Sequence, residues 1–413
     1  MAIVRPFRAV RPAKEYAEKV ISLPYDVMNR EEASKMADGN PYSFLHICRS
    51  EIDLPEVDNP YTEPVYAKAK KNIEDYLTNN ILIRDKEPLL YIYKQVMDGR
   101  SQVGIVGCVS IDEYQNNIIK KHEFTRVEKE IDRINHFDYC NTNTEPVFLT
   151  YRDDKRIRTL IEGWMNHHAP EYDFITEDGI GHTLWAITDQ NVNHSLTSLF
   201  GEIDSLYIAD GHHRSASAVK VGQKRREEHP DYTGNEEFNY FMAVIFPDDD
   251  LKIFDYNRVV KDLNGFSKEE FLQNISGKFL VEEIQNGPYR PEAKHIFGMY
   301  LKDQWYKLTA KAEIICEEDV IRSLDVSILQ ENLLQPVLGI DDPRTDKRID
   351  FVGGIRGLTE LERRVAKDMT VAFALYPVSI SDLLAVSDKG MVMPPKSTWF
   401  EPKLGSGLFM HQL

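Results

Sequence analysis

The chain has 413 residues, of which 42% are hydrophobic and 10% aromatic, and it carries a formal net charge of −17. This length and composition predict a globular protein with two domains and exclude an intrinsically disordered chain. The acidic balance argues against wide, nonspecific contact with nucleic acid or anionic lipid, because both depend on neutralising phosphate charge.

The cysteines and the apolar runs indicate a cytoplasmic, soluble protein. Four cysteines are scattered without CxxC or metal-ligand spacing, so we expect reduced thiols that act as small buried hydrophobes. The start of the chain lacks the features of a secretory leader, and the longest apolar runs fall far short of the roughly 20 residues that a membrane helix needs. The sequence gives no indication of the oligomeric state.

The first predicted elements alternate between helices and strands. After a turn-like break at 24–27, we expect a capped helix over 29–39, a strand over 42–48 and a helix over 64–79. The Asp98-Gly99 pair predicts a hairpin between 89–96 and 102–111. Further strands are expected at 145–151 and 182–187, with a helix over 155–167 between them. This alternation favours an α/β (α+β) fold with a mixed sheet.

The second half begins with a strand over 205–210 that runs directly into a helix. A strand over 239–246 is expected to pair with 251–256, which leaves Arg258 just beyond the pair. The domain boundary follows, with an α/β core at 1–260 and a smaller α+β region at 261–413. The elements expected in that region are a helix over 267–277, a hairpin of 295–301 with 305–309, a helix over 325–338 and a strand over 371–376.

The turn after the strand at 205–210 carries the most informative chemistry: Asp210, Gly211, His212, His213 and Arg214, with a helix of small residues from Ser215. Gly211 lets the backbone approach a ligand, Arg214 offers a planar fork to phosphate oxygens, and the histidines can donate or move a proton. A helix start also presents free N–H groups and a positive dipole end. Asp210 then either holds Mg²⁺ or takes a proton from an attacking hydroxyl. The alternative is a capping Asp210 and satisfied histidines at a sheet edge.

Two other motifs are weaker by themselves. The group of His122, Glu123 and Thr125 with Lys129, Asp132 and Arg133 is one of them. If this segment is helical, residues 122, 125, 129, 132 and 133 lie near one face, which more commonly means a salt-bridged surface. Glu123 gains interest only as a general base beside the phosphate turn. In the proline-rich tail, a final group could supply cations and hydroxyls to a phosphate without forming a Walker loop: Lys396, Ser397, Thr398 and Lys403.

Taken together, these motifs resemble a bacterial and archaeal family catalogued as domain of unknown function one thousand and fifteen, whose members were labelled ParB-like. The resemblance covers nearly the whole chain. It rests on Leu23-Pro24-Tyr25-Asp26-Val27, the His122-Glu123-x-Thr125 group with Asp132-Arg133, the turn at 210–214, and the tail from Met393 to Lys403. It implies that Tyr25 and Asp26 also belong to the site or support it, and we include Arg258 with them.

The turn itself resembles the phosphate-binding turn of the ParB and sulfiredoxin superfamily, and this match carries over to Gly211, His213 and Arg214. His212 stands where sulfiredoxins have their cysteine, so sulfinic acid repair is not expected. Free serine kinases share a similar turn, which implies a transferase of serine metabolism that moves a phosphoryl group from ATP, ADP or pyrophosphate to free L-serine with Mg²⁺.

In this interpretation the donor phosphates bind Gly211 N–H, His213, Arg214 and the helix start. Asp210 or Glu123 takes the proton of the hydroxyl. Three alternatives remain open at this point: a noncatalytic nucleotide-binding sensor, a ParB-like regulatory module, and a phosphoserine phosphatase. The acidic balance and the lack of a basic recognition helix speak against DNA binding.

Overall fold

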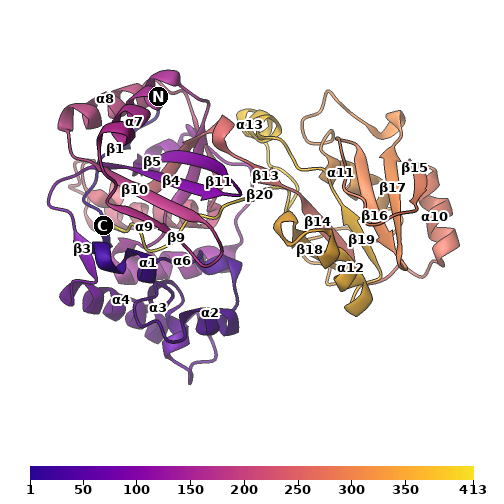
Figure 1. The fold of residues 1–413 in the computed structure, drawn as a ribbon, viewed down its shortest axis with the longest axis horizontal. Helices are drawn as coiled ribbons and strands as arrows, with labels where there is room; N and C mark the ends of the chain where they lie inside the picture. The colour runs from indigo at the N-terminus through magenta and orange to yellow at the C-terminus, as the bar shows by residue number, and fades with distance from the viewer. The chain divides into compact units, whose positions relative to one another are not determined.

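The computed structural model describes residues 1–413, which divide into two compact units. The first unit comprises Met1–Leu251 and Pro402–Leu413, and the second comprises Lys252–Glu401. In Figure 1 the indigo to magenta elements belong to the first unit and the orange elements to the second. The predicted boundary at residue 260 differs from this division in two ranges. Residues 252–260 belong to the second unit rather than the first, and residues 402–413 belong to the first rather than the second. The assignment of the units as two domains stays a prediction.

The first unit is built on a nine-stranded mixed sheet in the order β6-β11-β8-β12-β5-β4-β10-β9, with β1 paired to β5. Two pairs, β12 with β8 and β11 with β6, are parallel, and the others are antiparallel. The predicted mixed α/β fold class is therefore confirmed. The strands are β1 (Val4–Arg5), β4 (Leu90–Met97), β5 (Arg100–Ser110), β6 (Ile119–Lys120), β8 (Val147–Tyr151), β9 (Tyr172–Ile175), β10 (Gly181–Ile187), β11 (Leu206–Asp210) and β12 (Tyr240–Pro247).

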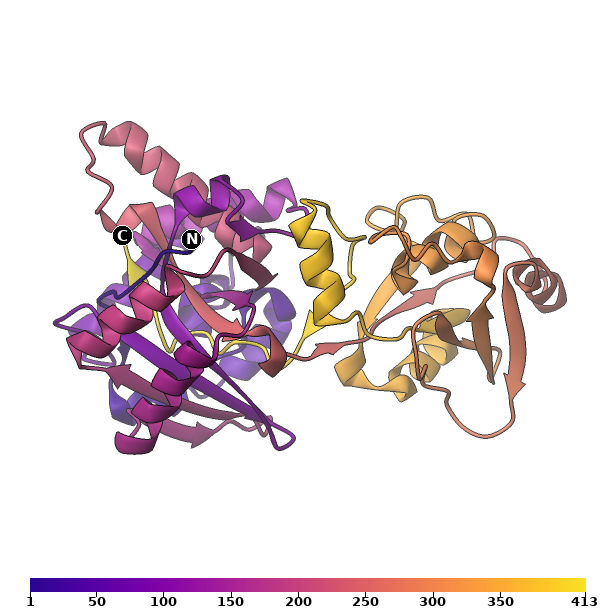
Figure 2. The same cartoon turned by 90° about the horizontal axis from the view of Figure 1, so that it is seen from above.

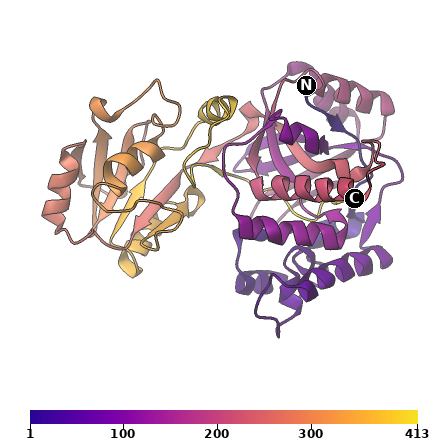
Figure 3. The same ribbon diagram turned by 180° about the vertical axis from the view of Figure 1, so that it is seen from behind.

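Alternate residues of the central strands point to one face, where they form a core with the helices. Val147, Leu149 and Tyr151 of β8 pack with Ala243 and Ile245 of β12 and with apolar residues of α6 to α9. Figure 3 shows α9, α6 and α4 as successive neighbours. The helices are α1 (Ala17–Val20), α2 (Arg30–Ala37), α3 (Leu45–Cys48), α4 (Glu63–Thr78), α5 (Ile111–Gln115), α6 (Val127–Cys140), α7 (Lys155–His167), α8 (Gln190–Phe200) and α9 (His212–Glu228).

The last residues of the chain are fastened to the first unit along their length. β21 (His411–Gln412) pairs with β7 (Thr142–Asn143), and two bridges join Met410 to Val10 and Ser406 to Ser22. Val10 also belongs to the small pair β2 (Val10–Pro12) and β3 (Leu82–Arg84). Because backbone hydrogen bonds fix this segment, Lys403 within it has a defined place in the first unit.

The second unit contains an antiparallel six-stranded sheet in the order β15-β17-β16-β19-β14-β18. Its helix α13 is the yellow helix in Figure 2. No helix of either unit has the length and apolar character needed to span a bilayer. The elements are β13 (Ile253–Phe254), β14 (Tyr256–Val260), α10 (Lys268–Ser276), β15 (Phe279–Ile284), β16 (Ile296–Leu301), β17 (Gln304–Ala310), α11 (Asp325–Leu329), β18 (Ile349–Gly353), α12 (Leu358–Lys367), β19 (Val371–Ala374), α13 (Ile380–Asp388) and β20 (Trp399–Phe400).

Two predicted elements are wrong. The strand expected at 42–48 contains helix α3, because its apolar residues all enter a core of helices, and a short apolar run has no period that separates strand from helix. The pairing of 251–256 with β12 does not occur, since β5 and β8 already occupy both edges of β12. Residues 253–254 pair with β20 instead.

A buried carboxyl in the second unit makes its stability depend on pH. Asp325 is 5% exposed; its Oδ1 accepts a 2.8 Å hydrogen bond from His295 N–H, and its Oδ2 has no partner. Burial raises the pKa of Asp325 to about 7, while the His295 N–H and Lys294 oppose the shift and Asp382 adds to it. The folded state therefore holds the Asp325 proton more tightly than the unfolded chain does, and it loses stability as pH rises from the ordinary pKa of 3.8 to about 7.

We expect Asp325→Asn to raise the free energy of unfolding at pH 9 by roughly 2–4 kcal/mol. The amide removes a buried charge whose cost to the folded state is of this order, given the shift in pKa. At pH 5 the gain should be smaller, because the folded parent still keeps the Asp325 proton there and only its unfolded chain is ionised. Urea unfolding at both pH values measures the difference, with the exposed Glu317→Gln as a control. An equal effect at pH 5 and pH 9 would contradict the assignment.

Candidate functional site

The candidate site is built on the turn that joins β11 to α9. The pairing of β11 with β8 shifts register between Ile208 and Asp210, and such a bulge re-aims the side chain that follows it. Gly211 then adopts φ 93° and ψ 32°, a left-handed conformation that favours glycine. A Cβ at Gly211 would lie 3.0 Å from Arg214 Nε. The turn therefore needs glycine for its backbone angles and for space.

Asp210 is held as a carboxylate by groups on both of its oxygens. Gly211 N–H donates to Oδ1 at 2.7 Å, Lys403 Nζ lies 3.0 Å from Oδ2, and Arg214 Nη2 lies 4.0 Å from Oδ1. Burial would raise the pKa of Asp210, but Lys403 and Arg214 outweigh it and bring the pKa below its ordinary value. The N–H of Gly211, which the sequence predicts to bind phosphate, therefore already donates its hydrogen bond to Asp210.

The first turn of α9 leaves three backbone donors without acceptors in the protein: the N–H groups of His212, His213 and Arg214. The first helical hydrogen bond runs from Ser215 N–H to Gly211 O at 2.9 Å, and no side chain caps the helix. Ser215 Oγ donates back to carbonyls of the same turn, so its hydroxyl is engaged there. Free N–H groups at the positive end of a helix of this length favour an anion.

The histidines of the site are neutral at pH 7. Burial lowers the pKa of both His212 and His122 to about 3, and it also lowers the pKa of His213. His212 Nε2 accepts from His122 N–H at 3.4 Å, and His213 Nε2 accepts from Arg126 N–H at 2.9 Å. A neutral histidine that accepts at Nε2 carries its proton on Nδ1. His213 can therefore donate from Nδ1.

Glu123 and several cations surround these histidines. Glu123 Oε2 lies 3.8 Å from His212 Nδ1, and its side chain is 39% exposed. Glu123 opposes the lowering of the His213 pKa, whereas the positive charges of Lys129 and Arg126 add to it. Thr125, also predicted for the site, donates to Glu130 Oε2 at 2.7 Å near the start of α6. The rim of the turn thus brings two cations, Arg126 and Lys129, close to His213 beside the carboxylate of Glu123.

Arg214 lies beneath the turn, where its side chain is only 2% exposed. Nη1 donates to Pro146 O at 2.6 Å, and Nε has no partner. Burial would lower the pKa of Arg214, but the negative charges of Asp26, Asp210 and Glu145 outweigh it and raise the pKa. This placement differs from the exposed phosphate fork that the sequence suggests. Direct phosphate binding by Arg214 stays a prediction, and its charge already offsets the acids around it.

A second group of predicted residues forms a buried ion network. Arg133 donates to Asp132 Oδ2 at 2.9 Å, lies 3.7 Å from Glu145 Oε2 and covers the ring of Tyr25 at 4.0 Å. Glu145 Oε1 accepts from Tyr25 N–H and from Ser406 Oγ. The sequence gives no signal for Glu145 beyond an acid before an apolar strand. It gives Lys403 only as one of several cations in the tail.

The remaining predicted residues lie in the second unit. Arg258 is buried, and its guanidinium donates to Tyr256 O and, at 3.1 Å, to Lys396 O. Lys396 Nζ lies 5.4 Å from the centre of the Tyr256 ring. Ser397 Oγ donates to Pro394 O at 2.6 Å. The predicted roles of Arg258, Lys396, Ser397 and Thr398 at the phosphate turn stay predictions.

The residues present do not form a ready Mg²⁺ site. No group of three His, Cys, Asp or Glu side chains in the chain is arranged to hold a metal ion. Both oxygens of Asp210 already meet donors, and a cation beside them would face Lys403. Mg²⁺ commonly binds through one or two carboxylates together with substrate phosphates. Its binding at Asp210 therefore stays a prediction.

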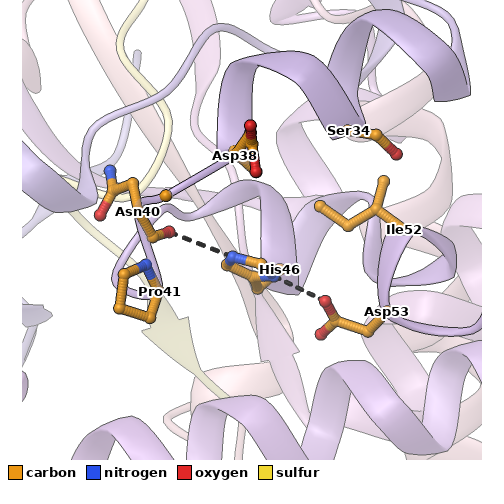
Figure 4. A pocket seen from close by; sticks show the side chains of 9 residues that line it. Ser34, Asp38, Asn40, Pro41, His46, Ile52 and Asp53 are labelled. Carbon is orange, nitrogen blue, oxygen red and sulfur yellow. Dashed lines mark hydrogen bonds and ion pairs between the residues drawn. The ribbon is translucent and has the colours of Figure 1, made fainter.

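A separate hollow of 380 Å³ opens near α2 and α3. Figure 4 shows His46 between Asn40 and Asp53, where its ring nitrogens lie 3.2 Å from Asn40 O and 2.7 Å from Asp53 Oδ1. Both partners only accept hydrogen bonds, so His46 carries both ring protons, and the bond to Asp53 raises its pKa. None of the predicted site residues lines this hollow.

We expect Gly211→Ala to lower the free energy of unfolding by about 2 kcal/mol, because a left-handed alanine is strained and its Cβ meets Arg214. Urea unfolding followed by tryptophan fluorescence measures the change. Gly163→Ala in α7 is the matched control, since a Cβ there meets nothing within 4 Å and alanine favours the helix. An unchanged stability of Gly211→Ala would show that the turn is not constrained as described.

Comparisons with known proteins give one family and several solved structures. A free serine kinase variant in complex with ADP matches with 15% identity and a TM-score of 0.37, over 73% of this chain and 92% of that chain. A conserved hypothetical protein from Pyrococcus furiosus matches with 15% identity and a TM-score of 0.35, over 73% and 95%. SbnI from Staphylococcus aureus, truncated at its C-terminus, matches with 13% identity and a TM-score of 0.37, over 72% and 84%.

No curated protein matches the chain. The family model described as "Protein of unknown function (DUF1015)" matches residues 4–327. This stretch includes the turn at 210–214, the segment 122–133, nearly all of the first unit and about half of the second. Since the match covers well over half of the sequence, the chain belongs to the DUF1015 family.

Proposed function

We propose that this chain is a phosphotransferase that moves a phosphoryl group from a nucleotide or pyrophosphate to the hydroxyl of free L-serine. The observation that carries the proposal is the start of α9, where three N–H groups have no acceptor in the protein and Asp210, just before the helix, holds Lys403. An anion is the natural partner of such a group of donors. The acceptor is inferred from the resemblance of the turn at 210–214 to that of free serine kinases.

The donor phosphates would be held by the N–H groups of His212, His213 and Arg214. Lys403 Nζ and the Nδ1–H of His213 would add two side-chain donors. Arg214 contributes from below, because its charge offsets Asp210 and Glu145 and keeps these acids from repelling the phosphates. Positioning and neutralisation of charge supply most of the catalysis in phosphoryl transfer, so such a set of donors suits the reaction.

In the transfer step, the serine hydroxyl oxygen forms a bond to phosphorus, and the bond between phosphorus and the leaving oxygen breaks. The hydroxyl proton passes to the Glu123 carboxylate. Glu123 suits this role better than Asp210, because Asp210 is held ionised by Lys403 and Arg214 and is a weak proton acceptor. Lys403 and His213 face the negative charge on the leaving oxygen. A Mg²⁺ ion bound with the donor would neutralise further charge on its phosphates.

The proposal is tested by incubating the purified protein with L-serine, Mg²⁺ and ATP, ADP or pyrophosphate in turn. We expect phosphoserine with at least one donor. Glu123→Gln should lower turnover by about 10²- to 10⁴-fold while the donor still binds, because only the base is lost. Glu128→Gln, at an exposed position of the same segment, is the matched control and should leave turnover unchanged.

Lys403→Met should weaken donor binding, since it removes a cation at the turn and leaves Asp210 to repel phosphate. Titration calorimetry with each donor measures this effect. The absence of phosphoserine with every donor would reject the kinase. Donor binding without turnover would instead identify a sensor, and release of phosphate from phosphoserine without an acceptor would identify a phosphatase.

A further inference from the structure

Three large apolar side chains next to the candidate site are exposed. Phe124, Val127 and Ile131 are 70%, 72% and 52% exposed, and we refer to them as the apolar platform. Val127 and Ile131 are four residues apart on α6 and so lie on one face of the helix, and Phe124 precedes its first turn. The opposite side of α6 is packed against α9 and α4, and its residues Phe137 and His136 are buried. The platform therefore lies on the solvent-exposed side of α6, which also carries Glu128, while the opposite side of the helix is packed.

The backbone fixes the platform at the edge of the phosphate turn. Phe124 lies midway between His122 and Arg126, whose N–H groups both donate to histidines at the start of α9. The segment 122–126 thus crosses the first turn of that helix. A ligand whose phosphates bind the free N–H groups of α9 would have the rest of its structure close to Phe124.

We propose that the apolar platform receives the base of a nucleotide donor; this inference rests on the proposed phosphotransferase. A base has a π face that stacks on an aromatic ring and packs against aliphatic side chains. The cations that act on His213, Lys129 and Arg126, belong to the same segment as the platform and suit the anionic part of such a ligand. The platform side chains lack hydrogen-bonding groups, so they would hold a base without choosing among bases.

The size of the platform and the charges of its neighbours Arg126 and Lys129 argue against a protein partner. A stable interface buries about 800 Å² on each partner, whereas three side chains expose at most a few hundred Å². A second copy of this chain placed symmetrically on the platform would bring Arg126 and Lys129 near their own equivalents. A small ligand with a flat apolar part and a negative charge fits both observations.

Binding of ATP, ADP and inorganic pyrophosphate to the full chain tests the inference by titration calorimetry. We expect Phe124→Ala to weaken ATP and ADP binding by about tenfold and to leave pyrophosphate binding unchanged. Phe124→Trp should bind both nucleotides at least as tightly as the parent. Ile175→Ala is the matched control, because Ile175 is 69% exposed in the same unit and lies outside the segment. Since Phe124 is exposed, neither substitution at this position should affect folding.

Several outcomes would overturn the proposed role of the platform. If Phe124→Ala loses the same affinity for nucleotides as for pyrophosphate, or loses no affinity at all, a contact between Phe124 and the base is excluded. If the parent protein forms phosphoserine from pyrophosphate and binds nucleotides no more tightly than Phe124→Ala does, the platform fails while the phosphotransferase stands. If the parent binds none of the three donors, both proposals fail.

Discussion

The ion pair between Asp210 and Lys403 is the interaction on which the candidate site depends. It joins the end of β11 to a segment that re-enters the first unit after the whole second unit has been traversed. The carboxylate also accepts from Gly211 N–H, so one side chain both stabilises the left-handed turn and fixes a cation beside it. The free N–H groups of α9 and the ammonium group of Lys403 are thereby brought to the same place.

The acids and bases around this pair are arranged in two layers. The outer layer holds Glu123 and the neutral His213, which are accessible to a ligand. The inner layer holds Arg214 and Arg133, whose charges are offset by buried acids that include Asp132 and Glu145. Ion pairs this deeply buried contribute little net stability, because the cost of removing their charges from water is large. Their value here lies in the fixed potential that they create beneath the turn.

Local sequence was sufficient for those parts of the fold that depend on neighbouring residues. The hairpin of β4 and β5 follows from Asp98-Gly99, the capped start of α2 follows from Asn29 and Glu32, and the turn at Gly211 follows from a strand that runs into a helix. The sequence could not reveal that Gly211 N–H serves Asp210, or that Arg214 lies beneath the turn. Both depend on the packing of side chains against Pro146 and Lys403, which are distant in the chain. The helix at α3 was missed because it has only four residues, too few to show a helical period.

The central claim is that the start of α9 and Lys403 together hold a polyphosphate. A crystal structure of the full chain with ADP or pyrophosphate tests it most directly. The account predicts phosphate oxygens within hydrogen-bonding distance of the N–H groups of His212, His213 and Arg214 and of Lys403 Nζ. Phosphates bound elsewhere, with the start of α9 left without a ligand, would contradict it.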